Sequence, residues 1–98
     1  AKKYFENALE NNPDIYDLIP TYKQFVLKNN LLPQAIIFIN KIITRKFPEH
    51  YHLHLLMIDL YNENKDVNHV LMYLKKAYQI KPTSEIANYI DNLSKIAH

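Results

Sequence analysis

A pattern of small and apolar residues that recurs along the chain constrains its fold more than any other feature. In each copy, a first small or apolar residue is followed by others four and seven positions later, and then by a proline. The copies start 34 and then 35 residues apart, at Ala1, Ala35 and Val70. The closing prolines are Pro13, Pro48 and Pro82, the second of them one position late. Spacings of four and seven form one stripe of a helix, and proline ends that helix because it lacks an N–H and disfavours helical backbone before it.

Further apolar stripes lie between these marked helices, so the chain is predicted to be all-α with about six helices. The start of the second helix is open: it either begins late, near Asp17 as its cap, or is kinked at Pro20. Asp66 and Thr83 are expected to cap the N-termini of the last two helices, and Pro33 suits a first turn. The predicted helices cover residues 1–11, 15–29, 33–46, 49–63, 67–80 and 84–97.

Composition narrows the classes of protein further. The chain has 98 residues, 48% of them hydrophobic, which fits one folded domain. Glycine is absent, which favours helices with short connections and excludes glycine-rich phosphate-binding loops. Cysteine is absent too, so disulfides and thiolate metal sites are excluded. A net charge of +2 is weak for a nucleic-acid binder, and no apolar run is long enough to span a membrane.

The period and the pattern resemble the tetratricopeptide repeat (TPR) family. The resemblance implies a TPR-like superhelix of antiparallel helix pairs, or α-solenoid, in a single domain over residues 1–98. We expect this domain to be a fragment of a longer protein, because the first residue is Ala1 rather than Met and lies inside a helical pattern. Its parts would be a half repeat (1–13), two repeats (14–48 and 49–82) and a closing helix (84–97). The tryptophan and glycine of the family's first helix are missing, and the residues in their places are Ile19 and Lys23, then His54 and Ile58.

In such a superhelix, the first helix of each pair lines a concave groove. The resemblance therefore implies a scaffold or adaptor that binds a peptide or helix of a partner protein there. The residues expected to bind the partner are Gln24, Lys28, His52, Leu55, Asp59 and Asn62. A second expectation is homo-oligomerisation through the first helix, where Tyr4, Phe5 and Leu9 have no preceding helix to cover them.

Two further resemblances give other expectations. The ending Ile80-Lys81-Pro82 and the period are similar to those of pentatricopeptide repeats, which would make the chain an RNA-binding module. The segment from Leu55 to Thr83, with Asp59 and Tyr73, resembles the final repeats of bacterial lipopolysaccharide assembly protein B. Members of that family are adaptors that regulate lipopolysaccharide synthesis on the cytoplasmic side of the inner membrane, so this resemblance implies a cytoplasmic domain of an anchored parent protein.

Residues that could carry chemistry are few. His50 and His54 lie one helical turn apart and could share a metal, but no third ligand is indicated. The alternative interpretation, without a metal site, is that His50, His52 and His54 lie at the exposed start of a helix. Asp14 and Asp17 are expected to be caps at a helix start rather than paired catalytic acids. The sequence therefore predicts no enzyme, no catalytic residue, no cofactor and no metal site.

Overall fold

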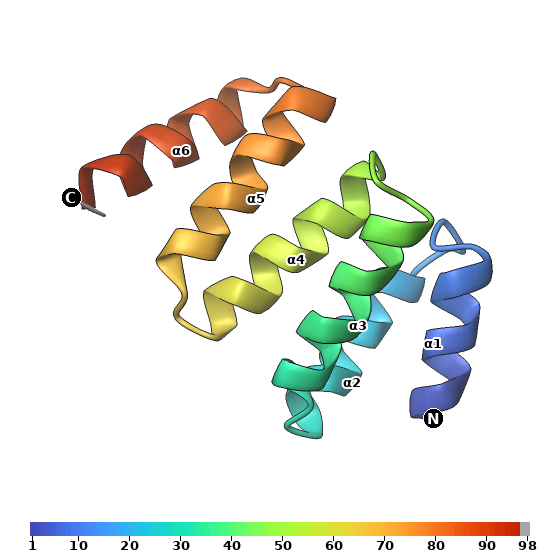
Figure 1. The fold of residues 1–98 in the computed structure, drawn as a ribbon. Coiled ribbons are helices and arrows are strands. Elements are labelled where there is room, and N and C mark those ends of the chain that lie inside the picture. Colours follow the sequence, from blue (N-terminus) through green and yellow to red (C-terminus); the bar gives the residue numbers. More distant parts are fainter. Residues whose placement is uncertain (97–98) are drawn as a thin grey trace.

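The computed structural model describes residues 1–96, and within them the chain forms six α-helices and no strand (Figure 1). The predicted helix ends lie within two residues of the observed ones, apart from the start of α2. The predicted end of the last helix at Ala97 lies outside the described residues. None of the described helices is long and apolar enough to cross a membrane. The bounds are α1 Lys2–Asn11, α2 Leu18–Lys28, α3 Leu32–Arg45, α4 Tyr51–Glu63, α5 Val67–Ile80 and α6 Ser84–Ile96.

The start of α2 settles the alternative that the sequence left open. The helix begins at Leu18, so the later start is confirmed and the range from residue 15 is wrong. Pro20 lies in the first turn, where its missing N–H costs no helical hydrogen bond. Asp17 takes the N-cap position with a left-handed backbone (φ 61°), but its side chain caps no backbone N–H. Its carboxylate instead accepts a hydrogen bond from the Thr21 hydroxyl at 3.3 Å.

The other helix ends follow local side-chain chemistry. The expected caps are present, because Asp66 accepts a hydrogen bond from the His69 N–H and Thr83 accepts one from the Ile86 N–H, both at 3.2 Å. Two short turns contain left-handed residues, Asn30 (φ 56°) and Lys65 (φ 57°). Asparagine tolerates this backbone better than most residues, which allows tight turns in a chain without glycine.

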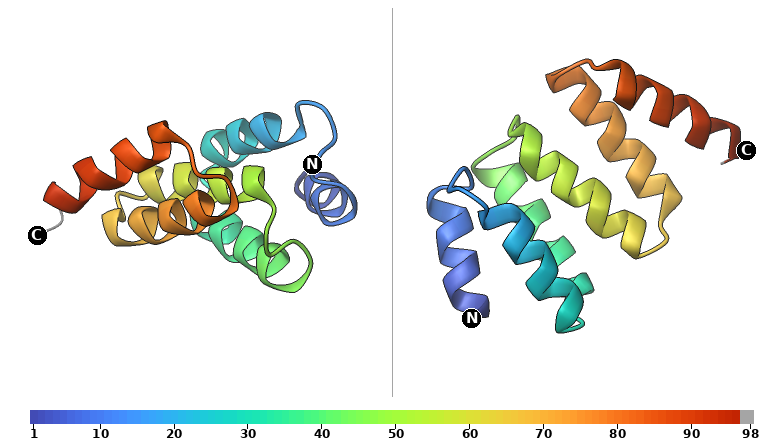
Figure 2. Two further views of the ribbon diagram at one scale, coloured as in Figure 1. Left: turned by 90° about the horizontal axis from the view of Figure 1, so that it is seen from above. Right: turned by 180° about the vertical axis from the view of Figure 1, so that it is seen from behind.

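The helices follow one another side by side, with α1 and α6 at opposite ends (Figure 1). Seen from above, α3 and α5 lie along one side, α2 and α6 along the other, and α4 between them (Figure 2). The closest packing joins α4 to α5, whereas α2 and α3 approach each other closely only over a short stretch. The helix α6 contacts mainly α5. The contact between α2 and α3 is therefore much less extensive than the contact between α4 and α5.

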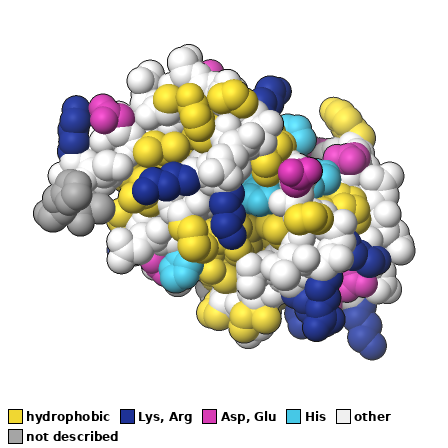
Figure 3. Space-filling model, turned by 45° about the horizontal axis from the view of Figure 1, so that its top comes forward, with side chains coloured by type: hydrophobic (Ala, Val, Ile, Leu, Met, Phe, Trp, Pro, Cys, Tyr) yellow, Lys and Arg dark blue, Asp and Glu magenta, His cyan; other side chains and the backbone are white. Residues whose placement is uncertain are grey.

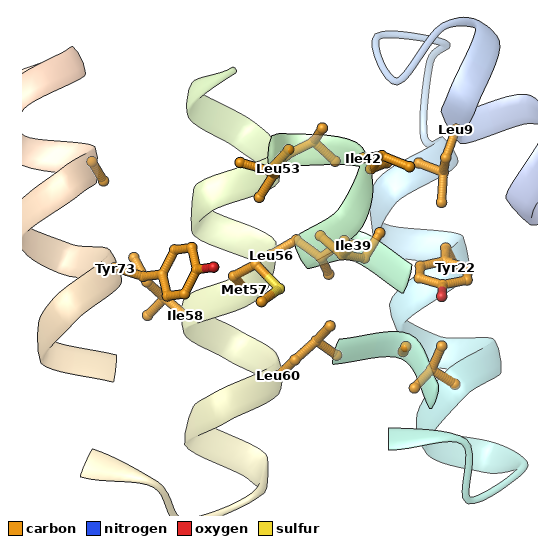
Figure 4. Close-up of a cluster of buried hydrophobic side chains, with 14 of the residues drawn as sticks. Leu9, Tyr22, Ile39, Ile42, Leu53, Leu56, Met57, Ile58, Leu60 and Tyr73 are labelled. Atoms are coloured by element: carbon orange, nitrogen blue, oxygen red, sulfur yellow. The ribbon is translucent and has the colours of Figure 1, made fainter. Parts of the chain in front are cut away.

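The hydrophobic core is centred on α4. Leu53, Met57 and Leu60 of this helix are fully buried, and Leu56 is nearly so. Figure 4 shows these side chains among buried side chains of the neighbouring helices, such as Tyr73 of α5. Because α4 lies at the centre of the core, it buries residues on several faces, including the successive positions 56 to 58. Its apolar residues are therefore not confined to one stripe.

The first helix is covered more fully than the sequence suggested. Leu9 is fully buried, and the Phe5 ring packs against Tyr22 and Phe25 of α2, with ring centroids 5.7 and 5.0 Å away. The expectation that Phe5 and Leu9 lack a partner is therefore wrong, because α2 folds back over that face of α1. Tyr4 remains exposed (70%).

Candidate functional site

A groove with a volume of about 540 Å³ opens on the surface. It lies between the turn formed by residues 13–17, the start of α2 and one face of α4. Ile15, Ile19 and Leu55 give it an apolar lining, and polar side chains surround them. Apolar concave surfaces with a few polar groups are the usual form of binding sites in proteins.

The structure places the six predicted partner-binding residues in two groups. His52, Leu55 and Asp59, one helical face of α4, line the groove. Gln24 and Lys28 of α2 and Asn62 of α4 are exposed but are not among the groove's lining residues.

On the α2 side, the sequence pointed to Gln24 and Lys28, which do not line the groove. There Lys23, the neighbour of the predicted Gln24, faces α4, since its Nζ lies 3.2 Å from Oδ2 of Asp59. One residue turns a helical position by about 100°, so a small change of register decides which side chain reaches the groove. The pair is partly exposed, and such pairs contribute about 0–1 kcal/mol.

The turn of residues 13–17 is held in place by a histidine that begins α4. The His50 Nδ1 accepts a hydrogen bond from the Leu53 N–H at 3.1 Å and so caps the helix. Because Nδ1 accepts, the proton of the neutral ring is on Nε2, which donates to Oδ1 of Asp14 at 2.7 Å. The Asp14 backbone N–H in turn donates to the side-chain oxygen of Asn12 at 3.0 Å. His50 therefore ties one wall of the groove to the other.

The three histidines at the start of α4 have three different surroundings. His52 is exposed and lines the groove, whereas His50 is half-buried. His54 is buried (2% exposed), and its Nδ1 donates to the His50 carbonyl oxygen at 2.7 Å. The interpretation of all three as an exposed helix start is therefore wrong for His54, because its side of α4 faces the Tyr73 ring of α5.

Burial of His54 makes the stability of the fold depend on pH. Desolvation lowers the pKa of His54, the hydrogen bond to the His50 carbonyl oxygen acts in the opposite direction, and the nearby Lys76 ammonium lowers it further. Histidine in the unfolded chain has its usual pKa of about 6.5. Below that pH, His54 therefore binds a proton more readily in the unfolded chain than in the folded one. We expect the free energy of unfolding to fall as pH drops from 7.5 to 5, by at most about 1.4 kcal/mol per pH unit from this residue.

Urea unfolding at several pH values measures this effect. The control is His54→Asn, whose side-chain amide can still donate to the carbonyl but does not titrate. The variant should show a smaller slope of unfolding free energy against pH. An unchanged slope would mean that another group causes the dependence. The Asp66 carboxylate is not that group above pH 5, since the hydrogen bond from the His69 N–H lowers its pKa below the usual range.

The groove lining combines His, Asp and Lys side chains with apolar ones. In the described part of the chain, no group of three or more His, Cys, Asp or Glu side chains could hold a metal ion. On the face shown in Figure 3, histidine and acidic side chains lie next to one another among hydrophobic ones, and a group of Lys and Arg side chains lies at the lower edge. Comparison with protein-family models, curated proteins and solved structures finds no match to this chain.

Proposed function

We propose that the chain is a TPR-like stack of helix pairs whose groove binds a segment of another protein, without catalysis. The main support for such a stack is the number of residues in the sequence that separate the two partners of each side-chain contact. Asp14 and His50 are 36 residues apart, and so are Lys23 and Asp59. The Lys46 Nζ donates to the Glu10 carbonyl oxygen over the same separation. Equal separations are expected where each unit contacts the next one in the same way.

A fourth contact on other faces of the helices agrees with this spacing. The Tyr73 hydroxyl of α5 donates to Oδ1 of Asn40 in α3 at 2.7 Å, over a separation of 33 residues. All four separations lie close to the sequence period of 34 and 35 residues. A fold without repeating units would have no reason to place its contacts at one period. The contacts thus support the same architecture as the recurring pattern.

The binding role is supported by the surface of the groove. Leu55 is half-buried there, and Ile15 and Tyr16 of the adjoining turn are exposed (47% and 95%). Large apolar side chains left open beside a groove favour contact with another polypeptide. An amphipathic helix or an extended segment could place apolar side chains against them, because the rigid walls of α2 and α4 need no ordering on binding.

Selection of peptides on the purified chain tests this function. A displayed library of random peptides would be panned against the protein, and the affinity of the selected peptides would be measured by fluorescence anisotropy. We expect Leu55→Arg to weaken binding at least tenfold, about 1.4 kcal/mol, because it places a charge in the apolar lining. The matched control is Ile37→Arg, an exposed position (70%) on α3 that is not among the groove's lining residues.

The outcomes of this test separate clearly. Loss of affinity in Leu55→Arg with no change in Ile37→Arg supports the groove as the binding site. Equal affinities of both variants and the original chain would place the binding surface elsewhere. A library that yields no binding peptide would contradict the proposed function itself.

A further inference from the structure

The groove carries a local charge opposite in sign to that of the whole chain. Asp14, Asp17 and Asp59 line it, and among the described lining residues Lys23 is the one Lys or Arg. The chain as a whole has a net charge of +2. The excess of carboxylates is therefore a local feature of the groove and does not follow from the net charge of the chain.

The hydrogen bonds show which carboxylates keep their charge uncompensated. Asp59 is paired with the Lys23 ammonium. Asp14 accepts from His50, whose ring is neutral in this arrangement because Nδ1 accepts the Leu53 N–H. Asp17 accepts from the Thr21 hydroxyl, which is also neutral. Asp14 and Asp17 thus present two negative charges at the edge of the groove.

These two carboxylates flank the exposed apolar side chains of the same turn. Ile15 and Tyr16 lie between them in the sequence, and all four residues line the groove. The side chain of Asp14 is 69% exposed, so a partner can reach it without displacing protein groups. One short turn therefore offers apolar surface, an aromatic ring and two carboxylates together.

We infer that the groove selects an amphipathic segment that carries both apolar side chains and Lys or Arg. This inference rests on the proposed binding function and adds the chemistry of the partner. An apolar side chain of the segment packs against Ile15, Ile19 and Leu55, and its neighbouring cation approaches Asp14 or Asp17. The exposed Tyr16 ring offers the same cation a favourable face. Phosphate groups are repelled by the carboxylates, so the occupant is a basic peptide and not RNA.

Three labelled synthetic peptides test the inference on the full chain by fluorescence anisotropy. The first is a short amphipathic peptide with Leu at helical spacing and Lys at its other positions. The second has Glu in place of every Lys, and the third has Ser in place of every Leu. We expect the Leu–Lys peptide to bind at least about tenfold more tightly than either of the others, since charge complementarity mainly sets partner choice.

Matched variants assign the selectivity to the turn. The double variant Asp14→Asn, Asp17→Asn removes two charges, and the amide oxygen that it places at position 14 can still accept from His50. We expect it to bind the Leu–Lys and Leu–Glu peptides with nearly equal affinity. The control Glu85→Gln, Asp91→Asn removes two exposed charges from α6, outside the groove lining, and should keep the selectivity.

The remaining outcomes distinguish the two proposals. If the original chain binds both Leu peptides equally, and both are lost in Leu55→Arg, the groove stands and the inference on charge is overturned. The same inference fails if the α6 control loses selectivity as much as the turn variant does. If neither Leu peptide binds better than the Ser peptide, both the inference and the proposed function fail.

Discussion

Replacing Leu60 with alanine is expected to lower the free energy of unfolding by about 2–5 kcal/mol, the usual cost of truncating a buried leucine. Leu60 is fully buried in α4, the helix on which the core is centred (Figure 4). The loss has two causes, the smaller apolar surface buried on folding and the cavity that packed neighbours cannot fill. Urea unfolding measures it directly, and the melting temperature should fall by about 4–8 °C for each kcal/mol.

The control for this experiment is Ile37→Ala on α3. It also removes a branched apolar side chain from a helix, but Ile37 is 70% exposed, so its truncation should change stability by less than about 0.5 kcal/mol. Similar losses in the two variants would contradict the central position of α4. A loss in Leu60→Ala that is accompanied by a much smaller denaturant slope would indicate that the variant no longer unfolds as one unit.

The burial of Leu60 also shows why much of the fold could be predicted. The stripe of Leu53, Leu56 and Leu60 has helical spacing, and a helix with such a stripe must cover it. Prolines and caps then fix most helix ends through local backbone chemistry. These effects act between residues close in the sequence, so they can be predicted from a single sequence.

The turn before α2 could not be predicted in the same way. Ile15 fits the apolar stripe of the following helix, which drew the predicted start to residue 15. In the structure Ile15 is 47% exposed and lies outside α2. Pro20 explains the difference, because in a longer helix its ring would clash with the carbonyl four residues earlier, that of Tyr16. Steric exclusion by one proline thus outweighs the apolar period.

The groove was predicted in part for a related reason. Helical spacing places His52, Leu55 and Asp59 on one face of α4, and the resemblance to tetratricopeptide repeats implied that this face lines a groove. The opposite wall depends on how far α2 is rotated about its axis, and that rotation places Lys23 beside Asp59. Helix rotation is set by packing of bulky neighbours such as Phe5 and Phe25, which the period of the repeat does not specify.

Replacing His50 with alanine is expected to lower the free energy of unfolding by about 0.5–3 kcal/mol. The variant loses the N-cap of α4, which typically contributes about 0.5–2 kcal/mol. It also loses the hydrogen bond to Asp14, whose net value is about 1 kcal/mol or less because the carboxylate is largely exposed. Affinity for peptides in the groove should fall as well, since the turn of residues 13–17 is no longer tied to α4.

The variant His50→Asn separates the effect of the N-cap from the effect of the hydrogen bond to Asp14. An asparagine oxygen can accept the Leu53 N–H as His50 Nδ1 does, but the shorter side chain ends before the position of Nε2 and does not reach Asp14. Its free energy of unfolding, measured in urea, should therefore fall by no more than the value of the Asp14 hydrogen bond, about 1 kcal/mol or less. Its affinity for groove peptides, measured by anisotropy, should fall as in His50→Ala. Asparagine and alanine variants of equal stability would show that the cap contributes nothing. An asparagine variant with undiminished affinity would show that the walls of the groove hold their positions without the Asp14 hydrogen bond.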